Sequence, residues 1–495
     1  MPEVGGRLRS MAIWDVRLQV RYGMYAVYAV LTLAYVLGLR AIGPAVRTDA
    51  TILLIVTDPT VLGFYFIAAI VLFEKEAGVL DALVTTPLGD RGYLLSKAVT
   101  LSLLAVVAAA VVAIGGHGTL GGLAVLIPGV ALSTALFVLI GFVAVARYDS
   151  VNEYFISAVG WGTVLFLPLF GYLGLIESSL FYLLPAQPVL VVVEAAFRPV
   201  SWWALSYAFG YLLVANVIAF IVARRAFRRH IVRGRESRQP RGQTRVDRSL
   251  RRNIVRSPWL GLVRADLRNW IRDPMLAFAA IGPLVLALAI RFGAPLVDTM
   301  VGQSYDLTSI YPVLGGTMTI FGAAIYGFIV GMFVLEDREQ GVLTAFRVSP
   351  LSPGGYLIYR GLTAFVFALL ATVPAIAVVG IVTVPLPVLV GAAAVGALGG
   401  PVLALGFGTF AINRIEGIAL SKLINLVVLG PALGIAVVPE PFQFVLGMVP
   451  TYWPVKAVVA SLSGEPAWPV YLLGGVVTHG IVLAVLINRF GNRVD

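Results

Sequence analysis

The chain contains no cysteine, only three histidines and few charged residues. Without cysteine it can form neither disulfides nor thiolate metal sites, although this absence gives no information about the compartment of its loops. Charged residues make up 12% of the sequence, against about 25% in typical soluble domains. The N-terminal stretch also lacks an apolar core followed by a small-residue cleavage site, so we expect no removed signal peptide.

What the chain has instead is a large excess of apolar residues. They make up 59% of the sequence, and the mean hydropathy is +0.93, so one soluble core cannot bury them. A bilayer core about 30 Å thick needs roughly 20 apolar helical residues for each crossing. Closed barrels alternate polar and apolar residues along each strand, and runs such as 98–114 do not. The sequence therefore predicts an all-α polytopic membrane protein.

Twelve apolar runs, six in each half, are predicted to cross the membrane. They are 22–39, 59–73, 98–114, 120–146, 155–176 and 202–223 in the first half, and 275–292, 312–335, 361–381, 386–411, 417–438 and 470–488 in the second. With the N-terminus inside, few basic residues fall in the external segments, as the positive-inside rule requires. We therefore expect a multi-pass protein of the cell membrane with both termini in the cytoplasm.

Two external segments, 177–201 and 439–469, are mostly apolar and are interrupted by prolines. They predict short re-entrant or interfacial helices before the last span of each half. Plain surface loops are the alternative.

The net charge of +11 is concentrated in one segment. Residues 224–256 contain 13 arginines against Glu236 and Asp247, which is the whole excess. This composition predicts a flexible cytoplasmic linker over 224–257 that is attracted to anionic lipid head groups. Because the rest of the chain is neutral, the charge does not indicate a nucleic-acid partner. The linker divides the sequence into a first module, 1–223, and a second module, 258–495.

A charged stretch between two apolar runs occurs once in each module. Residues 74–97, EKEAGVLDALVTTPLGDRGYLLSK, align without gaps with residues 337–360, DREQGVLTAFRVSPLSPGGYLIYR, and ten of these positions are identical. Lys97 aligns with Arg360, so positive charge is kept there. A polar segment that recurs at the same place in both halves suggests that the two segments have the same function.

Each repeated stretch is predicted to contain a short amphipathic helix. Val79, Leu80 and Leu83 form one apolar face, and Val342, Leu343 and Phe346 form the other. Pro87 and Pro350 push the residues before them out of helical conformation. A helix this short has only marginal stability in water. Its apolar face must therefore dock on the membrane surface, on the rest of the chain or on a soluble partner. A simple surface connector is the alternative function.

This loop resembles that of type-2 ABC export permeases. The pattern is Glu-x-Gly-Val-Leu, then Pro-Leu, then a basic residue that opens the next span. The resemblance implies six spans per module, each module preceded by an interfacial helix, here 11–21 and 263–275. It also implies that the loop forms a coupling helix against a nucleotide-binding subunit. The residues that match this coupling motif are Glu76, Gly78, Val79, Leu80, Leu83, Pro87, Glu339, Gly341, Val342, Leu343, Phe346 and Pro350.

The chain lacks the phosphate loop that ATP binding usually requires, G-x-x-x-x-G-K-[ST]. We therefore expect no enzyme activity and no cofactor in this chain itself. ATP and Mg²⁺ would be bound by two copies of a cytoplasmic ATPase partner, while this chain contacts the lipid bilayer and a small apolar substrate.

Two other classes compete with this interpretation. A twelve-span carrier of the major facilitator class also has two parallel halves, and PLGDRGYLLSK faintly resembles its loop signature. The acidic residues are expected at span ends or in loops, which argues against proton coupling. A membrane enzyme is the third class, but His117, His230 and His479 are scattered. We expect His479 to be hydrogen-bonded within the helix bundle.

Charged residues gather at the predicted inner ends of the fourth and fifth spans of each module. Because charges near hydrocarbon must pair or face water, they suggest an inner gate of rearranging salt bridges, with simple anchoring at head-group level as the alternative. The residues are Arg147, Asp149, Glu153, Arg414, Glu416 and Lys422.

Aromatic side chains within the spans are candidates for a substrate route between the halves. Such a lining suits an apolar or amphipathic molecule better than an ion. The candidates are Trp161, Phe166, Phe170, Tyr326 and Phe328.

Overall fold

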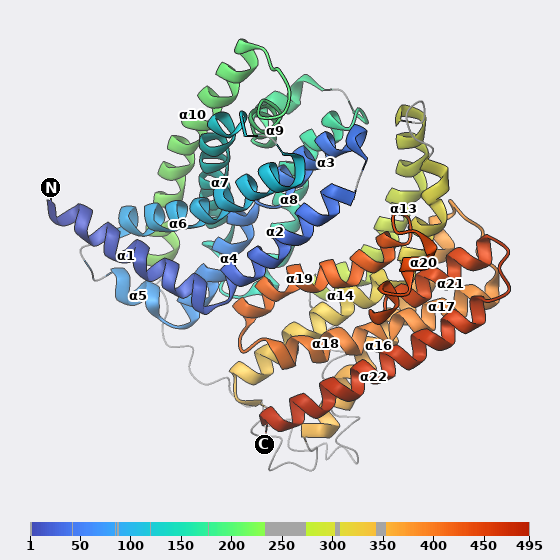
Figure 1. Cartoon of the computed structure of the whole chain (residues 1–495). Coiled ribbons are helices and arrows are strands. Elements are labelled where there is room, and N and C mark those ends of the chain that lie inside the picture. Colours follow the sequence, from blue (N-terminus) through green and yellow to red (C-terminus); the bar gives the residue numbers. More distant parts are fainter. Residues whose placement is uncertain are drawn as a thin grey trace. The chain divides into compact units, whose positions relative to one another are not determined.

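The computed structural model describes residues 2–41, 43–84, 86, 89–118, 120–176, 178–232, 274–301, 307–342 and 353–494. Throughout these ranges the regular structure is helical, without strands. The chain divides into two compact units, Met1–Asn253 and Ile254–Asp495 (Figure 1). Most of the predicted second interfacial helix, the linker from residue 233 onward, Pro87, Leu343, Phe346 and Pro350 lie outside the described residues.

The first unit begins with a long helix, α1, which starts nine residues before the predicted surface segment at Met11. Its elements are α1 (Pro2–Arg21), α2 (Met24–Ala41), α3 (Pro44–Thr57), α4 (Leu62–Glu76), α5 (Val79–Val84), α6 (Gly89–Val112), the π-helical η1 (Ala113–His117), α7 (Leu123–Val145), α8 (Val151–Tyr172), η2 (Ser179–Leu183), α9 (Ala186–Glu194), α10 (Trp202–Ala226) and the π-helical η3 (Phe227–Val232). The predicted linker is therefore helical over residues 224–232.

The second unit repeats much of this order. Its elements are α13 (Pro274–Val301), η5 (Leu307–Ile310), α14 (Tyr311–Glu339), α16 (Pro353–Val379), α17 (Leu386–Ala397), α18 (Gly399–Phe410), α19 (Arg414–Gly434), α20 (Glu440–Gln443), η6 (Leu446–Met448), α21 (Tyr452–Leu462) and α22 (Trp468–Val494). In sequence position α14 corresponds to α4, α16 to α6, and α22 to α10.

Among the described residues, eleven helical stretches are long and apolar enough to cross a bilayer. They match eleven of the twelve predicted spans, and the chain is an all-α polytopic membrane protein. The exception is α8, whose apolar part, Ser157–Tyr172, is shorter and rises only about 24 Å. One predicted span was too short, because the stretch from Val46 to Glu76 consists of α3 and α4 joined by a turn.

Small residues allow the central helix of each unit to approach its neighbours closely. In the first unit a Cβ added to Gly63 of α4 would lie 3.0 Å from the carbonyl oxygen of Thr134 on α7. In the second, a Cβ on Gly327 of α14 would lie 2.9 Å from the carbonyl oxygen of Gly400 on α18. Helices α4 and α14 are therefore mostly buried, whereas α10 and α22 are largely exposed.

The two predicted external segments contain the short helices α9 and α21. Pro188, Val189 and Val192 of α9 are buried, as are Val455 and Val458 of α21. These segments are therefore packed helices and not plain surface loops. Their depth relative to the bilayer stays a prediction.

Candidate functional site

The repeated loop of the first unit folds into α5, directly after Gly78 with φ of 68°. Leu80 and Leu83 are buried, and α5 lies against α4, α6 and η3. Val79 is 43% exposed, and Ala82 is exposed beside it. The buried leucines of α5 therefore dock on the rest of the chain, and not on the membrane surface or a soluble partner.

This burial divides the predicted coupling residues of the first loop into buried and accessible ones, and their role in partner contact stays a prediction. Leu80 and Leu83 anchor α5, because a side chain with 2% or 8% of its surface exposed has little area left for a partner. The accessible side of the loop contains Glu76, Val79 and Ala82. In the second copy Glu339 and Gly341 are exposed and Val342 is half-buried.

A buried ionic network joins the start of α6 to α1 and α4. Lys97 Nζ lies 2.8 Å from Asp15 Oδ1 and 2.5 Å from Glu74 Oε1. Tyr93 donates a hydrogen bond of 2.6 Å to the other oxygen of Glu74, and Ser96 donates one of 2.5 Å to Asp15. All five residues are at most 5% exposed. Buried charges are tolerated when they are paired and hydrogen-bonded, so this network fixes three helices near α5.

The second unit contains a related network at positions 263 residues further along. Arg360 Nη2 lies 2.8 Å from Asp337 Oδ2, and Tyr356 donates a hydrogen bond to the same carboxylate oxygen. Arg360 Nε also donates to the Tyr356 hydroxyl at 3.1 Å. The network was not predicted, although the repeat contained its signal: a carboxylate, a tyrosine and a cation are kept at these three places.

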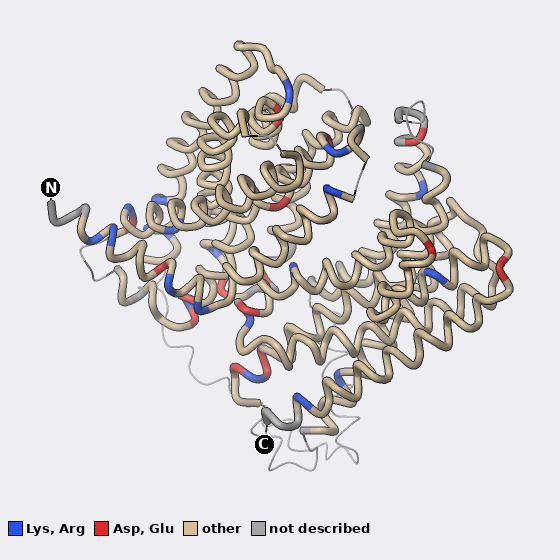
Figure 2. The backbone as a smooth tube through the Cα atoms, viewed as in Figure 1, with Lys and Arg blue, Asp and Glu red and all other residues tan. Residues whose placement is uncertain are grey.

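Charged residues of the first unit gather along the chain around α1, α5 and the adjoining ends of α4 and α6 (Figure 2). This is the side that the positive-inside pattern assigns to the cytoplasm. The ionic network and the short helix α5 therefore belong to the same charged end of the unit.

The predicted gate residues of the first unit lie at the start of α8. Glu153 caps this helix: its N–H donates to Ser150 Oγ at 3.2 Å, and its carboxylate accepts from the N–H of Asp149 at 3.3 Å. Such reciprocal capping satisfies backbone donors at a helix start. Asp149 also lies 3.6 Å from Lys75, near the end of α4. Arg147 donates to the hydroxyl of the neighbouring Tyr148.

The equivalent residues of the second unit repeat this capping at the start of α19. The N–H of Glu416 donates to Asn413 Oδ1 at 2.9 Å, and its carboxylate accepts from Ile412 N–H at 2.8 Å. Arg414 forms a 2.6 Å ion pair with Glu339 at the end of α14. Lys422 lies two turns further along α19 and is half-buried. In both units the ion pairs thus connect the end of the central helix to the helix that follows the fourth span.

One acidic residue contradicts the expectation that carboxylates lie only at span ends or in loops. Asp58 stands between α3 and α4, within the apolar stretch from Val46 to Glu76. It is 7% exposed and accepts hydrogen bonds from Tyr35 at 3.1 Å and Tyr28 at 3.5 Å. The turn between the two helices was missed, so Asp58 was placed at the edge of a shorter span.

His479 is buried, as expected, with Nδ1 2.8 Å from the carbonyl oxygen of Gly475 one turn earlier. Within the described part of the chain, no three His, Cys, Asp or Glu residues lie close enough together to hold a metal ion.

The five candidate substrate-route residues differ in accessibility. Trp161 and Phe170 of α8 are 39% and 43% exposed, and Phe166 is half-buried. Tyr326 is only 4% exposed and stacks on Phe367 at 5.7 Å between ring centroids. Tyr326 is therefore packed against a neighbouring helix of the second unit, and its place in a substrate route stays a prediction. Phe328 packs against Phe407 at 5.6 Å and contributes mainly to the core of the second unit.

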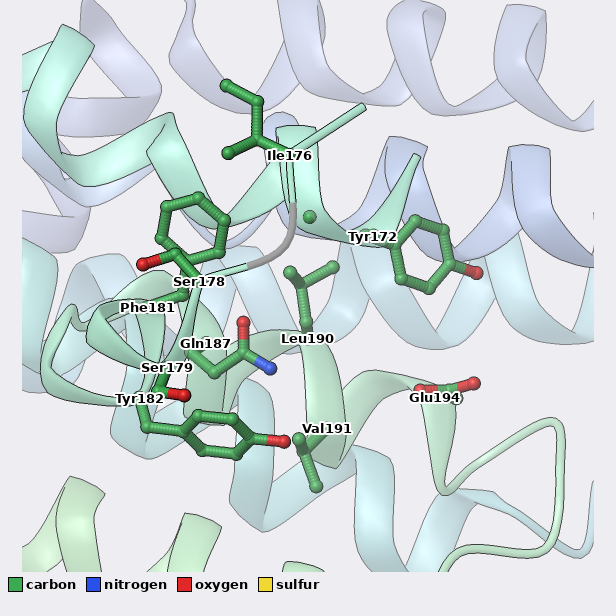
Figure 3. A pocket seen from close by; sticks show the side chains of 11 residues that line it. Tyr172, Ile176, Ser178, Ser179, Phe181, Tyr182, Gln187, Leu190, Val191 and Glu194 are labelled. Atoms are coloured by element: carbon green, nitrogen blue, oxygen red, sulfur yellow. The ribbon is translucent and has the colours of Figure 1, made fainter. Parts of the chain in front are cut away.

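A pocket of about 330 Å³ lies at the end of α8 that is remote from its capped start. Figure 3 shows its walls, which come from the last residues of α8, from η2 and from α9. Aromatic rings of Tyr172 and Phe181 stand there beside the polar side chains of Gln187 and Glu194. The pocket thus combines apolar and polar surface at the end of the helix that exposes Trp161 and Phe170.

Membrane-length helices in two corresponding units, each with the same charged loop after its central helix, are typical of an integral membrane permease. The chain belongs to the fluoroquinolone export permease family. The sequence model described as "Fluoroquinolones export permease protein family" matches residues 6–235. A second, described as "Fluoroquinolones export permease protein Rv2686c-like", matches residues 266–487.

Two relatives come from Mycobacterium tuberculosis (strain ATCC 25618 / H37Rv). Fluoroquinolones export permease protein Rv2687c is 32% identical over 221 residues, which cover 93% of that protein and 44% of this chain. Fluoroquinolones export permease protein Rv2686c is 28% identical over 237 residues, which cover 91% of that protein and 46% of this chain. This chain is therefore a two-module form of an export permease, since each relative matches less than half of it.

Proposed function

We propose that this chain is the membrane-spanning part of a type-2 ABC exporter. It would move apolar or amphipathic drugs outward across the cell membrane, with fluoroquinolones as the first compounds to test because its relatives bear that name. Two ATPase subunits, one for each repeated loop, would bind and hydrolyse ATP with Mg²⁺ in the cytoplasm. The observation that carries the proposal is the anchored helix α5, whose leucines are buried while Val79 faces outward.

The buried network explains how a force on α5 would reach the membrane helices. α5 follows α4 after a two-residue turn and lies beside η3, the extension of α10. Lys97 joins α4 to α1 and α6 through two short ion pairs. Since breaking a buried pair leaves an uncompensated charge, these helices would move together when an ATPase pushes on the loop.

The same movement would reach α8. Lys75, in the last turn of α4, donates to the carbonyl oxygens of Ala146 and Tyr148 at 2.6 and 2.7 Å, directly before α8. A shift of α4 would therefore displace the start of α8. In this mechanism the exposed rings of Trp161 and Phe170 contact an aromatic substrate, and the pocket beside Glu194 receives it at the outer end of the helix.

The proposal is tested by drug accumulation in cells that lack their own efflux pumps. The chain is expressed with a candidate ATPase, with the same ATPase carrying an alanine in place of its phosphate-loop lysine, or alone. We expect a fluorescent fluoroquinolone to accumulate less only in cells with the intact pair. Efflux by the chain without any ATPase would reject the proposed energy source. Unchanged accumulation of fluoroquinolones together with reduced accumulation of other amphipathic dyes would reject the substrate but keep the exporter.

A further inference from the structure

An apolar groove runs along the membrane-spanning part of the first unit, between α6, α7 and α10. This α6–α10 groove is lined by α6 from Leu95 to Val106, by α7 from Ile127 to Leu139 and by α10 from Asn216 to Ile221, and it encloses about 680 Å³. Its polar side chains are already satisfied by the protein. Ser102 donates to the carbonyl oxygen of Ala131 at 3.2 Å, and Asn216 donates to that of Leu132 at 2.9 Å. The groove therefore suits an apolar occupant.

The length and exposure of the α6–α10 groove match one leaflet of a bilayer. From Leu95 to Val106 the axis of α6 rises about 16 Å, which is about half of a hydrocarbon core roughly 30 Å thick. Val99 and Val217 in its walls are 59% and 61% exposed. An occupant can thus enter sideways from the surrounding lipid.

Arginines surround the end of the groove that lies on the charged side of the unit. Asp90 Oδ2 accepts from Arg224 Nε at 3.2 Å and from Arg228 Nε at 2.8 Å. Arg91 precedes Leu95 by one helical turn, and Arg225 follows Ile221 by one turn, so both continue the lining faces of α6 and α10. Both are exposed. Four arginines with one shared carboxylate present many N–H donors, a composition that suits a phosphate group.

The second unit has a corresponding groove without this cationic mouth. Ile358, Leu362 and Phe365 line it 263 positions after Leu95, Val99 and Ser102, and its volume is about 470 Å³. Where the first unit has Asp90, Arg91, Arg224 and Arg225, the second has Pro353, Gly354, Ile487 and Asn488. The nearby Arg489 is two positions from Ile487 and so does not continue the lining face of α22.

We propose that the α6–α10 groove of the first unit binds one anionic phospholipid of the adjacent leaflet. One acyl chain lies between α6, α7 and α10, and the phosphate contacts Arg91, Arg225 and the two arginines that flank Asp90. The groove of the second unit does not share this preference for anionic lipid. The inference is independent of the transported substrate and of the ATPase.

Native mass spectrometry of the purified full chain tests the proposal, with phosphatidylglycerol and phosphatidylcholine added in equal amounts. We expect the wild-type chain to retain phosphatidylglycerol preferentially. The variant Arg91→Gln/Arg225→Gln should lose this preference by roughly tenfold or more, since each arginine near a membrane surface contributes appreciably to anionic-lipid attraction. Asp90→Asn should increase the preference for phosphatidylglycerol. Arg489→Gln is the matched control in the second unit and should leave the preference for phosphatidylglycerol unchanged.

The apolar part of the groove is tested separately. Ser102→Phe introduces the side chain that the second unit has at this place, and it should reduce retention of both lipids. Val99→Trp fills the groove from its exposed side and replaces this variant if Ser102→Phe lowers thermal stability. Equal retention of the two lipids by the wild-type chain, or equal effects of Arg489→Gln and the double arginine variant, would overturn the proposal.

Discussion

Lys97 of α6 forms a 2.5 Å ion pair with Glu74 of α4, and both side chains are at most 6% exposed. The corresponding pair of the second unit, Arg360 and Asp337, is more accessible, with 14% and 20% of the side-chain surface exposed. The two repeated loops are therefore each held by an ion pair at the same place, but the pair of the first unit is more deeply buried. This difference leads to the first of five predictions.

Lys97→Met should destabilise the chain strongly, because it leaves Asp15 and Glu74 as buried carboxylates without their cation. Removing one partner of a buried pair costs about 3–5 kcal/mol. Arg360→Met should cost less, because its pair is partly exposed. Thermal unfolding in detergent, monitored by size-exclusion chromatography, ranks the stabilities of the two variants. The triple variant Asp15→Asn/Glu74→Gln/Lys97→Met should recover part of the loss, and equal melting of the two single variants would contradict the difference.

Val79→Asp should separate partner binding from folding. Val79 is exposed, so the variant should reach the membrane in normal amount and keep the melting temperature of the wild type. It should nevertheless lose most ATPase co-purification, since the charge lies on the accessible side of α5. Leu80→Asp is the contrasting variant: it buries an unpaired carboxylate and should lower stability by several kcal/mol. Undiminished ATPase capture by Val79→Asp would show that α5 is only a connector.

Gly78→Ala and Gly341→Ala should each destabilise the repeated loop by about 1–2 kcal/mol, the usual cost of a left-handed backbone for an L-residue. Their φ values are 68° and 71°, and an added Cβ would meet no atom within 4 Å, so the effect comes from the backbone alone. Protease cleavage of the loop in the purified chain measures it. The controls are Gly78→Asn and Gly341→Asn, because asparagine tolerates this conformation better. They should destabilise the loop less than the alanine variants do.

Glu153→Gln and Glu416→Gln distinguish capping from gating. Glutamine can still accept the backbone hydrogen bonds that the carboxylates accept now, so we expect nearly normal drug export at normal expression. Ser150→Ala and Asn413→Ala should instead cost about 1 kcal/mol of helix stability each. If the two glutamine variants stop export without loss of stability, the salt-bridge gate is supported and the capping role alone is insufficient.

Asp58→Asn distinguishes an ATP-driven exporter from a proton-coupled carrier. Asparagine keeps an acceptor for Tyr35 but cannot carry a proton at this buried site, where carboxylates of carriers often act. With an ATPase as the motor, we expect export to continue at a rate within a few fold of the wild type. Export assays in ATP-depleted cells with an imposed pH gradient provide the comparison. Gradient-driven export that Asp58→Asn abolishes would favour the carrier.

The apolar runs of the sequence were sufficient to predict the helical membrane architecture and nearly all spans. Their length and lack of alternation leave no other way to satisfy the backbone in a bilayer. The ungapped repeat likewise located the loop and the glycine before α5. The α8 span and the α3–α4 turn were harder to predict, because polar and apolar residues mix at their ends and helix boundaries depend on packing.

Only the tertiary structure decided which side of each element is accessible. Leu80 and Val79 are adjacent and both apolar, yet one anchors α5 and the other faces outward, because burial depends on contacts with α4, with α6 and with η3, which lies far along the chain. The same holds for Asp15, Glu74 and Lys97, whose charges are visible in the sequence but whose pairing requires three helices to meet. The sequence by itself determined that the chain crosses the membrane in two related modules, whereas long-range packing decided which residues are available to a lipid, a drug or a partner.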